Sequence, residues 1–232
     1  FSGTEVWTVA GRGNRPLGIN LPDPVPLDPA KEGHHCPFCE QRYLETPPEK
    51  SRVIRHGDGN WETRYRVAAE DLHATVAEFR RIPNLFEILS FDYWNLNYGY
   101  ELPSRVRERK AAYLDSAAGR DHVLAVVRNK LKAGGRTDEM IDALGEDGQL
   151  AAASGFFGGG HDVIVARRHF VDGATDNTQL AASGTLTPEE HYRFFAFTIE
   201  STQALFDLNR YARYVAVFQN WLKPAGASFD HL

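Results

Sequence analysis

Cysteine is scarce in this chain, since only two of its 232 residues are cysteines. Domains that depend on disulfides carry several cysteine pairs, so the composition excludes a disulfide framework. No stretch approaches the roughly 20 apolar residues that a membrane helix needs, and no hydrophobic region typical of a signal peptide opens the chain. We therefore expect a cytosolic protein with no membrane partner.

Clusters of basic residues are also missing. The chain has 26 Lys and Arg against 31 Asp and Glu, a formal net charge of −5. Proteins that bind a nucleic-acid backbone usually show a basic stripe, so we expect no nucleic-acid partner. The content of 42% hydrophobic and 12% aromatic residues is enough for an ordinary globular core.

The strongest local signal is the pair Cys36 and Cys39, separated by Pro37 and Phe38. Two thiolates at this spacing can hold one tetrahedral ion, and two imidazoles, from His169 and His231, can complete a Cys₂His₂ set. The alternative is a redox pair. In redox pairs the first cysteine usually lies at the N-terminus of a helix that follows a strand. Here a proline-rich connector over 21–30 precedes the pair instead, so we favour metal binding.

The choice of histidines remains open at this point. His34, His35 and His161 compete with His169 and His231 as ligands, because an isolated histidine is more often a structural residue than a ligand.

Several strands are predicted from alternation and from turn residues. Residues 5–10 form one candidate, and 52–56 and 63–68 form a hairpin around a Gly-Asp-Gly-Asn turn. Residues 162–167 are the clearest strand, and 214–220 are predicted to follow as another. His169 and His231 follow the ends of these two strands, so the two imidazoles would lie close together if the strands were neighbours.

Helical patterns occupy two regions. From 102 to 147 the sequence is charged and alanine-rich, with one apolar face that contains Val123, Val126, Val127 and Leu131. We interpret 102–160 as a helical insertion between two halves of one sheet. A second helix is predicted to begin at Thr187-Pro188-Glu189-Glu190 with a capping box. Its apolar stripe is expected to lie across the sheet and comprises Tyr192, Phe195, Ile199 and Phe206.

Five motifs occur in an order that resembles the galactose-1-phosphate uridylyltransferase family of the histidine triad superfamily. They are Gly11-Arg12-x-x-Arg15-Pro16, the CxxC pair, Pro83-Asn84-x-Phe86, a strand leading to His169, and Phe218-x-Asn220 with Gly226-x-Ser228-x-x-His231. The resemblance does not cover 102–160, and Gln219 replaces an acidic residue often seen in that family.

The resemblance implies an α+β, histidine-triad-like fold: an antiparallel sheet with a long helix across it, of which 1–232 would be an incomplete domain. It also implies that Cys36, Cys39, His169 and His231 bind a mainly structural Zn²⁺. His231 would be the first histidine of an His-x-His-x-Gln motif. The second histidine, the nucleophile, would lie beyond Leu232, so no catalytic residue is expected within this chain and the chain alone is expected to be inactive.

The same resemblance implies a set of residues that bind the nucleotide and its phosphates: Arg12, Arg15, Asn84, Asn220, Gly226 and Ser228. Guanidinium forks suit a diphosphate, a glycine allows close approach of the backbone, and a hydroxyl can contact a phosphate oxygen. The alternatives are solvated surface arginines, an ordinary turn at 223–226 and asparagines that satisfy nearby backbone. Phe218 is expected in the core.

The implied function is transfer of a nucleoside monophosphate between sugar phosphates through a nucleotidyl-histidine intermediate. The partners would be a nucleoside diphosphate sugar and a sugar phosphate, and the family tendency is a homodimer. The family acts in galactose metabolism, but the resemblance does not identify the sugar on which this protein would act. Two alternatives stay open: a dinucleoside polyphosphate hydrolase or phosphorylase of the same superfamily, and a zinc-stabilised binding domain without catalysis.

Overall fold

The computed structural model describes residues 23–87, 89–219 and 231–232. Its centre is one antiparallel sheet of four strands in the order β2-β1-β3-β4. The strands are β1 (Ser51–Arg55), β2 (Trp61–Tyr65), β3 (Phe79–Pro83) and β4 (Asp162–Ala166). β1 and β2 form the predicted hairpin, with Val53 opposite Thr63. The predicted α+β class with an antiparallel sheet is confirmed.

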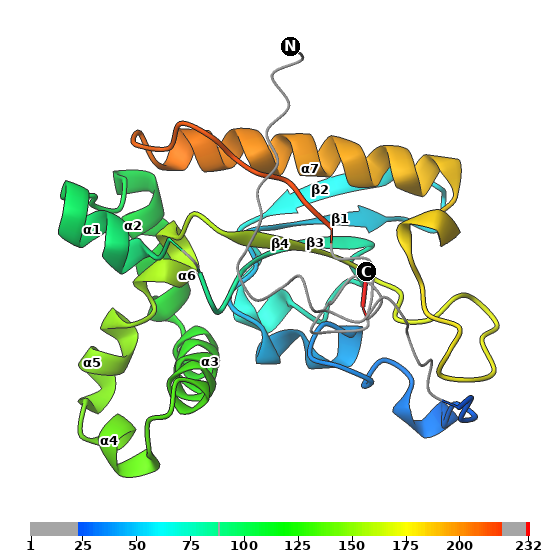
Figure 1. The fold of residues 1–232 in the computed structure, drawn as a ribbon, viewed down its shortest axis with the longest axis horizontal. Coiled ribbons are helices and arrows are strands. Elements are labelled where there is room, and N and C mark those ends of the chain that lie inside the picture. The colour runs from blue at the N-terminus through cyan, green and yellow to red at the C-terminus, as the bar shows by residue number, and fades with distance from the viewer. Residues whose placement is uncertain (1–22, 88, 220–230) are drawn as a thin grey trace, which may run out of the picture.

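The long helix α7 (Pro188–Leu208) lies across one face of this sheet, as Figure 1 shows. It begins at the predicted residues because the Thr187 hydroxyl accepts from the Glu190 backbone N–H, and the Glu190 carboxylate accepts from the Thr187 N–H. Phe197 of α7 is buried with Val53 and Phe79 of the sheet. The capping box thus fixes where α7 begins, and the inner face of α7 covers one side of the core.

The inner face of α7 is not the predicted one. Phe197, Ser201 and Leu208 are buried. The predicted stripe faces outward, with exposed fractions of 64% for Tyr192, 54% for Phe195, 68% for Ile199 and 40% for Phe206. The helix has apolar residues on more than one side, and packing against the sheet selects among them.

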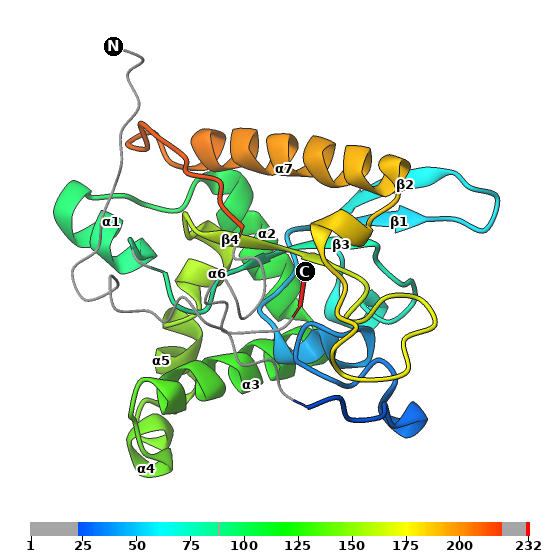
Figure 2. The same ribbon diagram turned by 45° about the vertical axis from the view of Figure 1, so that its right-hand side comes forward.

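A group of helices lies to one side of the sheet in Figures 1 and 2. The α-helices are α1 (Phe91–Tyr98), α2 (Ser104–Asp115), α3 (Ala117–Ala133), α4 (Asp138–Asp142), α5 (Gly145–Ala151) and α6 (Ser154–Gly158). The 3-10 helices of the described chain are η1 (Pro29–Lys31), η2 (Glu40–Glu45), η3 (Ala69–Asp71) and η4 (Ser183–Thr185). Within the described residues, no helix has the length and apolar character needed to cross a bilayer.

The helices α1–α6 form an excursion between two neighbouring strands. β3 ends at Pro83, which pairs with Asp162 at the start of β4. The apolar face of α3 packs as predicted, since Val123, Val126 and Val127 are buried in one cluster with residues of α6. The helices of the excursion therefore share a hydrophobic core, which Ala69 and Leu208 also join.

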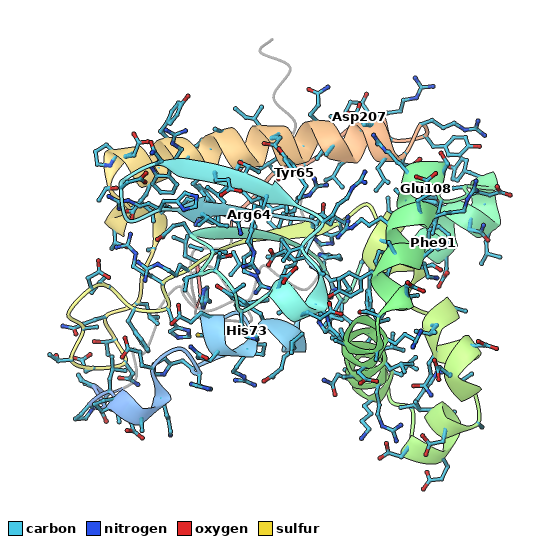
Figure 3. All side chains as sticks on the ribbon, turned by 180° about the vertical axis from the view of Figure 1, so that it is seen from behind. Arg64, Tyr65, His73, Phe91, Glu108 and Asp207 are labelled. Carbon is cyan, nitrogen blue, oxygen red and sulfur yellow. The ribbon has the colours of Figure 1, made fainter. Side chains whose placement is uncertain are left out.

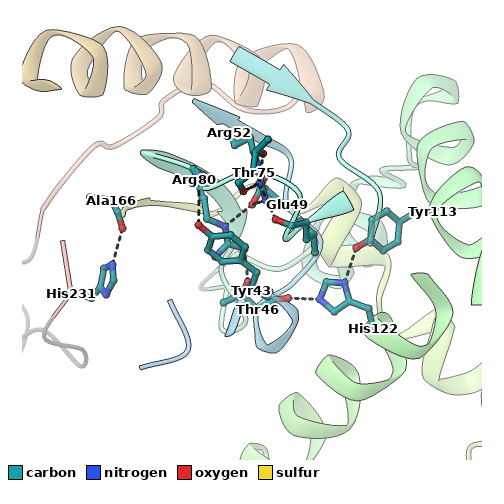
Figure 4. A network of polar contacts seen from close by, with 12 residues as sticks. Tyr43, Thr46, Glu49, Arg52, Thr75, Arg80, Tyr113, His122, Ala166 and His231 are labelled. Carbon is teal, nitrogen blue, oxygen red and sulfur yellow. Dashed lines mark hydrogen bonds and ion pairs between the residues drawn. The ribbon is translucent and has the colours of Figure 1, made fainter. Parts of the chain in front are cut away.

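A buried polar network joins the excursion to the sheet (Figure 4). Arg52 of β1 and Arg80 of β3 both bind the carboxylate of Glu49. The imidazole of His122, on α3, donates from Nε2 to the Thr46 carbonyl at 2.8 Å and accepts at Nδ1 from the Tyr113 hydroxyl at 2.7 Å. These contacts fix α2 and α3 against the segment that precedes β1.

Two strand predictions have different outcomes. Residues 5–10 lie outside the described residues. Residues 214–219 are described and contain no regular secondary structure, so the predicted strand is wrong there. The backbone N–H of Ala166 in β4 donates instead to the carbonyl of Leu232 at 2.7 Å. Phe218, predicted in the core, is 67% exposed. Residues 214–218 are a continuous apolar run, which favours extended backbone, but a strand also needs a hydrogen-bonded partner, and 214–219 has none in the sheet of the described residues.

Candidate metal centre

The structure brings four side chains from three distant segments into one cluster: Cys36, Cys39, His169 and His231. Their potential ligand atoms all lie within 4.8 Å of one another. Both cysteines are buried, and both imidazoles are partly buried. The cluster could hold a metal ion, because two thiolates and two imidazoles are ligands that suit a tetrahedral site.

The two cysteines lie on a tight turn. The Cys39 N–H donates to the Cys36 carbonyl at 3.0 Å, and η2 begins directly after Cys39. Gly33 has φ +73°, a conformation that favours glycine, and a Cβ on it would lie 2.7 Å from Cγ of Gln41. The Gln41 N–H donates to the Gly33 carbonyl at 3.1 Å. This close approach fixes the turn that presents both sulfur atoms.

His169 follows β4 and is held by its neighbours. The Arg167 N–H donates to the Glu78 carbonyl at 2.9 Å, and the Ala181 N–H donates to the His169 carbonyl at 3.0 Å. Arg168 forms an ion pair of 2.5 Å with Glu190 in the first turn of α7. The His169 imidazole therefore lies on backbone anchored to both the sheet and the long helix.

His231 is oriented by a hydrogen bond outside the cluster. Its Nε2–H donates to the Ala166 carbonyl at 2.7 Å (Figure 4). In a neutral imidazole this leaves the lone pair on Nδ1, the atom that faces the cluster. A backbone carbonyl that selects the tautomer is a common feature of metal-binding histidines.

The distances between ligand atoms are short. The two sulfurs are 3.7 Å apart, and the two Nδ1 atoms of His169 and His231 are 3.2 Å apart. The sulfur of Cys36 is 3.2 Å from His231 Nδ1, and the sulfur of Cys39 is 3.6 Å from His169 Nδ1 and 4.0 Å from His231 Nδ1. All four atoms converge on one small volume.

The two thiols differ in acidity. Their mutual hydrogen bond, followed by burial, raises the pKa of Cys36. The same hydrogen bond lowers the pKa of Cys39, and the neighbouring histidines lower it further. The thiolate is the form that binds a metal ion, so metal binding would release any proton that the pair retains.

The competing histidines do not join the cluster. His34 is exposed, and its Nδ1 lies 2.9 Å from the Glu32 carbonyl oxygen. The His35 ring packs 5.4 Å from that of His169, and burial lowers the pKa of His35. His161 lies beside Asn84, with 3.3 Å between its Nε2 and the amide nitrogen.

Of the residues that the resemblance assigns to the nucleotide, only Asn84 lies in the described part of the chain. It follows β3, and its Oδ1 accepts from the Phe86 N–H at 2.9 Å. Arg12, Arg15, Asn220, Gly226 and Ser228 lie outside the described residues.

A group of buried charged side chains, separate from the metal cluster, was not predicted from the sequence. Lys50 and Arg81 both bind Asp162, each at 2.6 Å, and all three side chains are less than 10% exposed. The available signal was the presence of charged residues inside apolar strands, as in Arg80-Arg81 of β3. Charges at such positions are buried only when they are paired.

The fold and the cluster define an α+β protein with a Cys₂His₂ group able to hold a metal ion. The whole chain, residues 1–232, matches the model of a family described as "Domain of unknown function (DUF4921)". The chain belongs to this family. Neither the curated proteins nor the solved structures contained a match.

Proposed function

We infer that this domain is the zinc-binding part of a nucleotidyltransferase that resembles galactose-1-phosphate uridylyltransferase. The observation that carries the proposal is the convergence of Cys36, Cys39, His169 and His231. These are the four ligands, in the same order along the chain, that the resemblance implies.

The spacing of the cluster supports zinc. With bonds of about 2.3 Å to sulfur and about 2.0–2.1 Å to nitrogen, a tetrahedral ion separates two sulfurs by about 3.8 Å, two nitrogens by about 3.3 Å and a mixed pair by about 3.6 Å. The corresponding distances here are 3.7 Å, 3.2 Å and, for three of the four mixed pairs, 3.2–4.0 Å, and all four atoms lie within 4.8 Å of one another. A Cys₂His₂ set without a carboxylate favours zinc over Mg²⁺ or Ca²⁺.

The role of such an ion would be mainly structural. Four protein ligands leave no open position for a substrate, as is usual in closed zinc sites. The chain's own contribution is to hold His231 beside β4 through Ala166 and to hold His169 through the Arg168–Glu190 pair. Both contacts hold backbone near the cluster in place. The reactive histidine of the family motif would lie beside that backbone.

A nucleotide could bind near the end of β3. Asn84 contacts His161, and the ring of His161 lies 6.5 Å from that of Phe218. Phe218 is well exposed. An exposed aromatic ring beside an amide and an imidazole offers stacking and hydrogen bonding, which suits a nucleobase.

The proposed reaction has two displacements. A histidine nitrogen attacks the α-phosphorus of a nucleoside diphosphate sugar, and the sugar phosphate leaves. A second sugar phosphate then attacks the nucleotidyl-histidine and releases the free imidazole. The resemblance implies that the attacking histidine lies two positions after His231.

Metal analysis tests the ligand set. Purified protein is expected to contain one zinc ion per chain, and Cys36→Ser is expected to lose most of it, because a serine hydroxyl is a poor zinc ligand. His34→Ala is the matched control, since His34 lies near the cysteines but outside the cluster. Absence of zinc, or an unchanged zinc content in Cys36→Ser, would contradict the assignment.

The reaction is tested separately with the longest natural polypeptide that contains this chain. Incubation with UDP-sugars and a hexose 1-phosphate is expected to exchange the sugar, and a nucleotidylated histidine should be detectable by mass spectrometry. Turnover of dinucleoside polyphosphates alone would instead indicate the hydrolase or phosphorylase. No turnover of either, with zinc bound, would indicate a binding domain.

A further inference from the structure

A cavity of about 260 Å³ lies between α2 and the segment that follows β2. Its walls are formed by Arg66, Ala68, Glu108, Arg109, Ala112 and Tyr113. In Figure 3, Glu108 lies on α2, beside the sheet that carries Arg64 and Tyr65. Figure 4 separates Tyr113 from His231 by the Glu49 network, so the cavity is distinct from the metal cluster.

Arg109 has unused hydrogen-bonding capacity in this wall. Its Nη2 donates to the Glu49 carbonyl at 2.6 Å, and its Cζ lies 5.8 Å from the centre of the Phe157 ring. Its Nε is buried and has no hydrogen-bond partner in the described chain. A buried donor without an acceptor is unfavourable, and a guanidinium makes the penalty larger.

The surroundings of Arg109 contain an excess of buried positive charge. Lys50 and Arg81 share the single carboxylate of Asp162. The Glu49 carboxylate is shared in turn by the guanidinium groups of two arginines on β1 and β3. With Arg109 there are five cations against these two carboxylates, and a third buried carboxylate, Glu87, lies near Lys50. Burial, and then the charge of Arg81, lowers the pKa of Arg109 to about 10.

Arg66 adds a second guanidinium from the opposite wall. It is exposed and has φ +59°, whereas the other described residues with positive φ are glycines. A left-handed conformation is unfavourable for arginine by about 1 kcal/mol. The conformation turns the chain immediately after Tyr65, and it places Arg66 at the cavity.

We propose that this cavity binds the phosphate group of a small phosphorylated molecule between Arg109 and Arg66. Guanidinium groups hydrogen-bond phosphate oxygens in a planar fork. A group carrying about two negative charges at pH 7 matches the uncompensated cations better than a carboxylate does. Ala68, Ala112 and Tyr113 provide apolar surface for the remainder of the ligand. This site does not depend on the proposed nucleotidyltransferase activity.

The first experiment is calorimetric titration of the metal-loaded chain with inorganic phosphate at low ionic strength. One phosphate is expected to bind per chain. Arg66→Asn should weaken binding about tenfold, because one charge-assisted contact is lost. Asparagine tolerates positive φ, so this variant is expected to fold as well as the parent protein. Thermal unfolding without phosphate checks this point.

Two variants on α2 separate a local effect of charge from a general one. Glu108→Gln removes a negative charge from the cavity wall and should tighten phosphate binding by about twofold to fivefold. Arg107→Gln is the control, since Arg107 is an exposed neighbour outside the cavity lining. It should leave the affinity within about twofold, which also excludes a general effect of net charge.

Competition defines the ligand class. Sulfate, a dianion of similar shape, should displace phosphate, whereas acetate at the same concentration should not. Equal affinity in Arg66→Asn and the parent protein would overturn the proposal, as would equal competition by acetate. No detectable phosphate binding would also overturn it.

Discussion

His122 shows how one buried residue couples stability to pH. Its imidazole is 4% exposed and fully hydrogen-bonded, as a donor to Thr46 and an acceptor from Tyr113. Burial lowers the pKa of His122. A protonated ring would lose its acceptor at Nδ1, so the folded protein requires the neutral form.

The unfolding free energy is therefore expected to fall as the pH drops below about 6.5, the ordinary pKa of histidine. The unfolded chain then binds a proton that folded His122 does not. The loss is at most about 1.4 kcal/mol per pH unit and ends at the folded pKa. Urea unfolding of the parent protein and His122→Gln between pH 7.5 and 5 measures it. A difference between the two that does not change with pH would contradict this expectation.

The sequence revealed some residues of the sites and concealed others. The short spacing of Cys36 and Cys39 was visible directly, whereas His169 and His231 were selected by the resemblance and lie far away along the chain. Arg109 and Glu49 gave no pattern, because the burial of a charge depends on which segments pack around it.

At the scale of elements, α7 separates its two apolar sides. Phe197 is 2% exposed and packs against the sheet, whereas Ile199 is 68% exposed. Phe197→Ala is expected to lower the unfolding free energy by about 3–5 kcal/mol, because it leaves a cavity. Ile199→Ala should change it by less than about 0.5 kcal/mol. Chemical denaturation of both variants measures these values, and a larger loss in Ile199→Ala would mean that the outer face is covered.

The start of α7 could be predicted and its orientation could not. A capping box is a local interaction between Thr187 and Glu190, so adjacent residues determine it. The choice of the inner face depends on the sheet. The failed strand over 214–219 has the same origin, since an apolar run favours extended backbone locally but does not determine whether that backbone pairs with the sheet.

At the scale of the whole molecule, the cluster connects the segment before β1, the segment after β4 and residue 231. Removal of the metal with a chelator is expected to loosen all three together, because ion binding contributes to folding. Hydrogen exchange should increase at residues 33–45 and 167–181. Exchange in α5, which packs against α3 and α4, should stay the same. Uniformly faster exchange, or no change near the cysteines, would contradict a local structural role.

The pairing of Pro83 with Asp162 has a consequence for the order of folding. The two strands β3 and β4 meet only after the whole excursion between them has been brought back to its starting point. Each doubling of such a loop adds only about 0.6 kcal/mol of closure entropy, so the excursion has little effect on equilibrium stability. Contacts between residues distant in sequence form slowly, however. The α-helical excursion, rich in local contacts, is expected to assemble first and to deliver β4 to the free edge of β3.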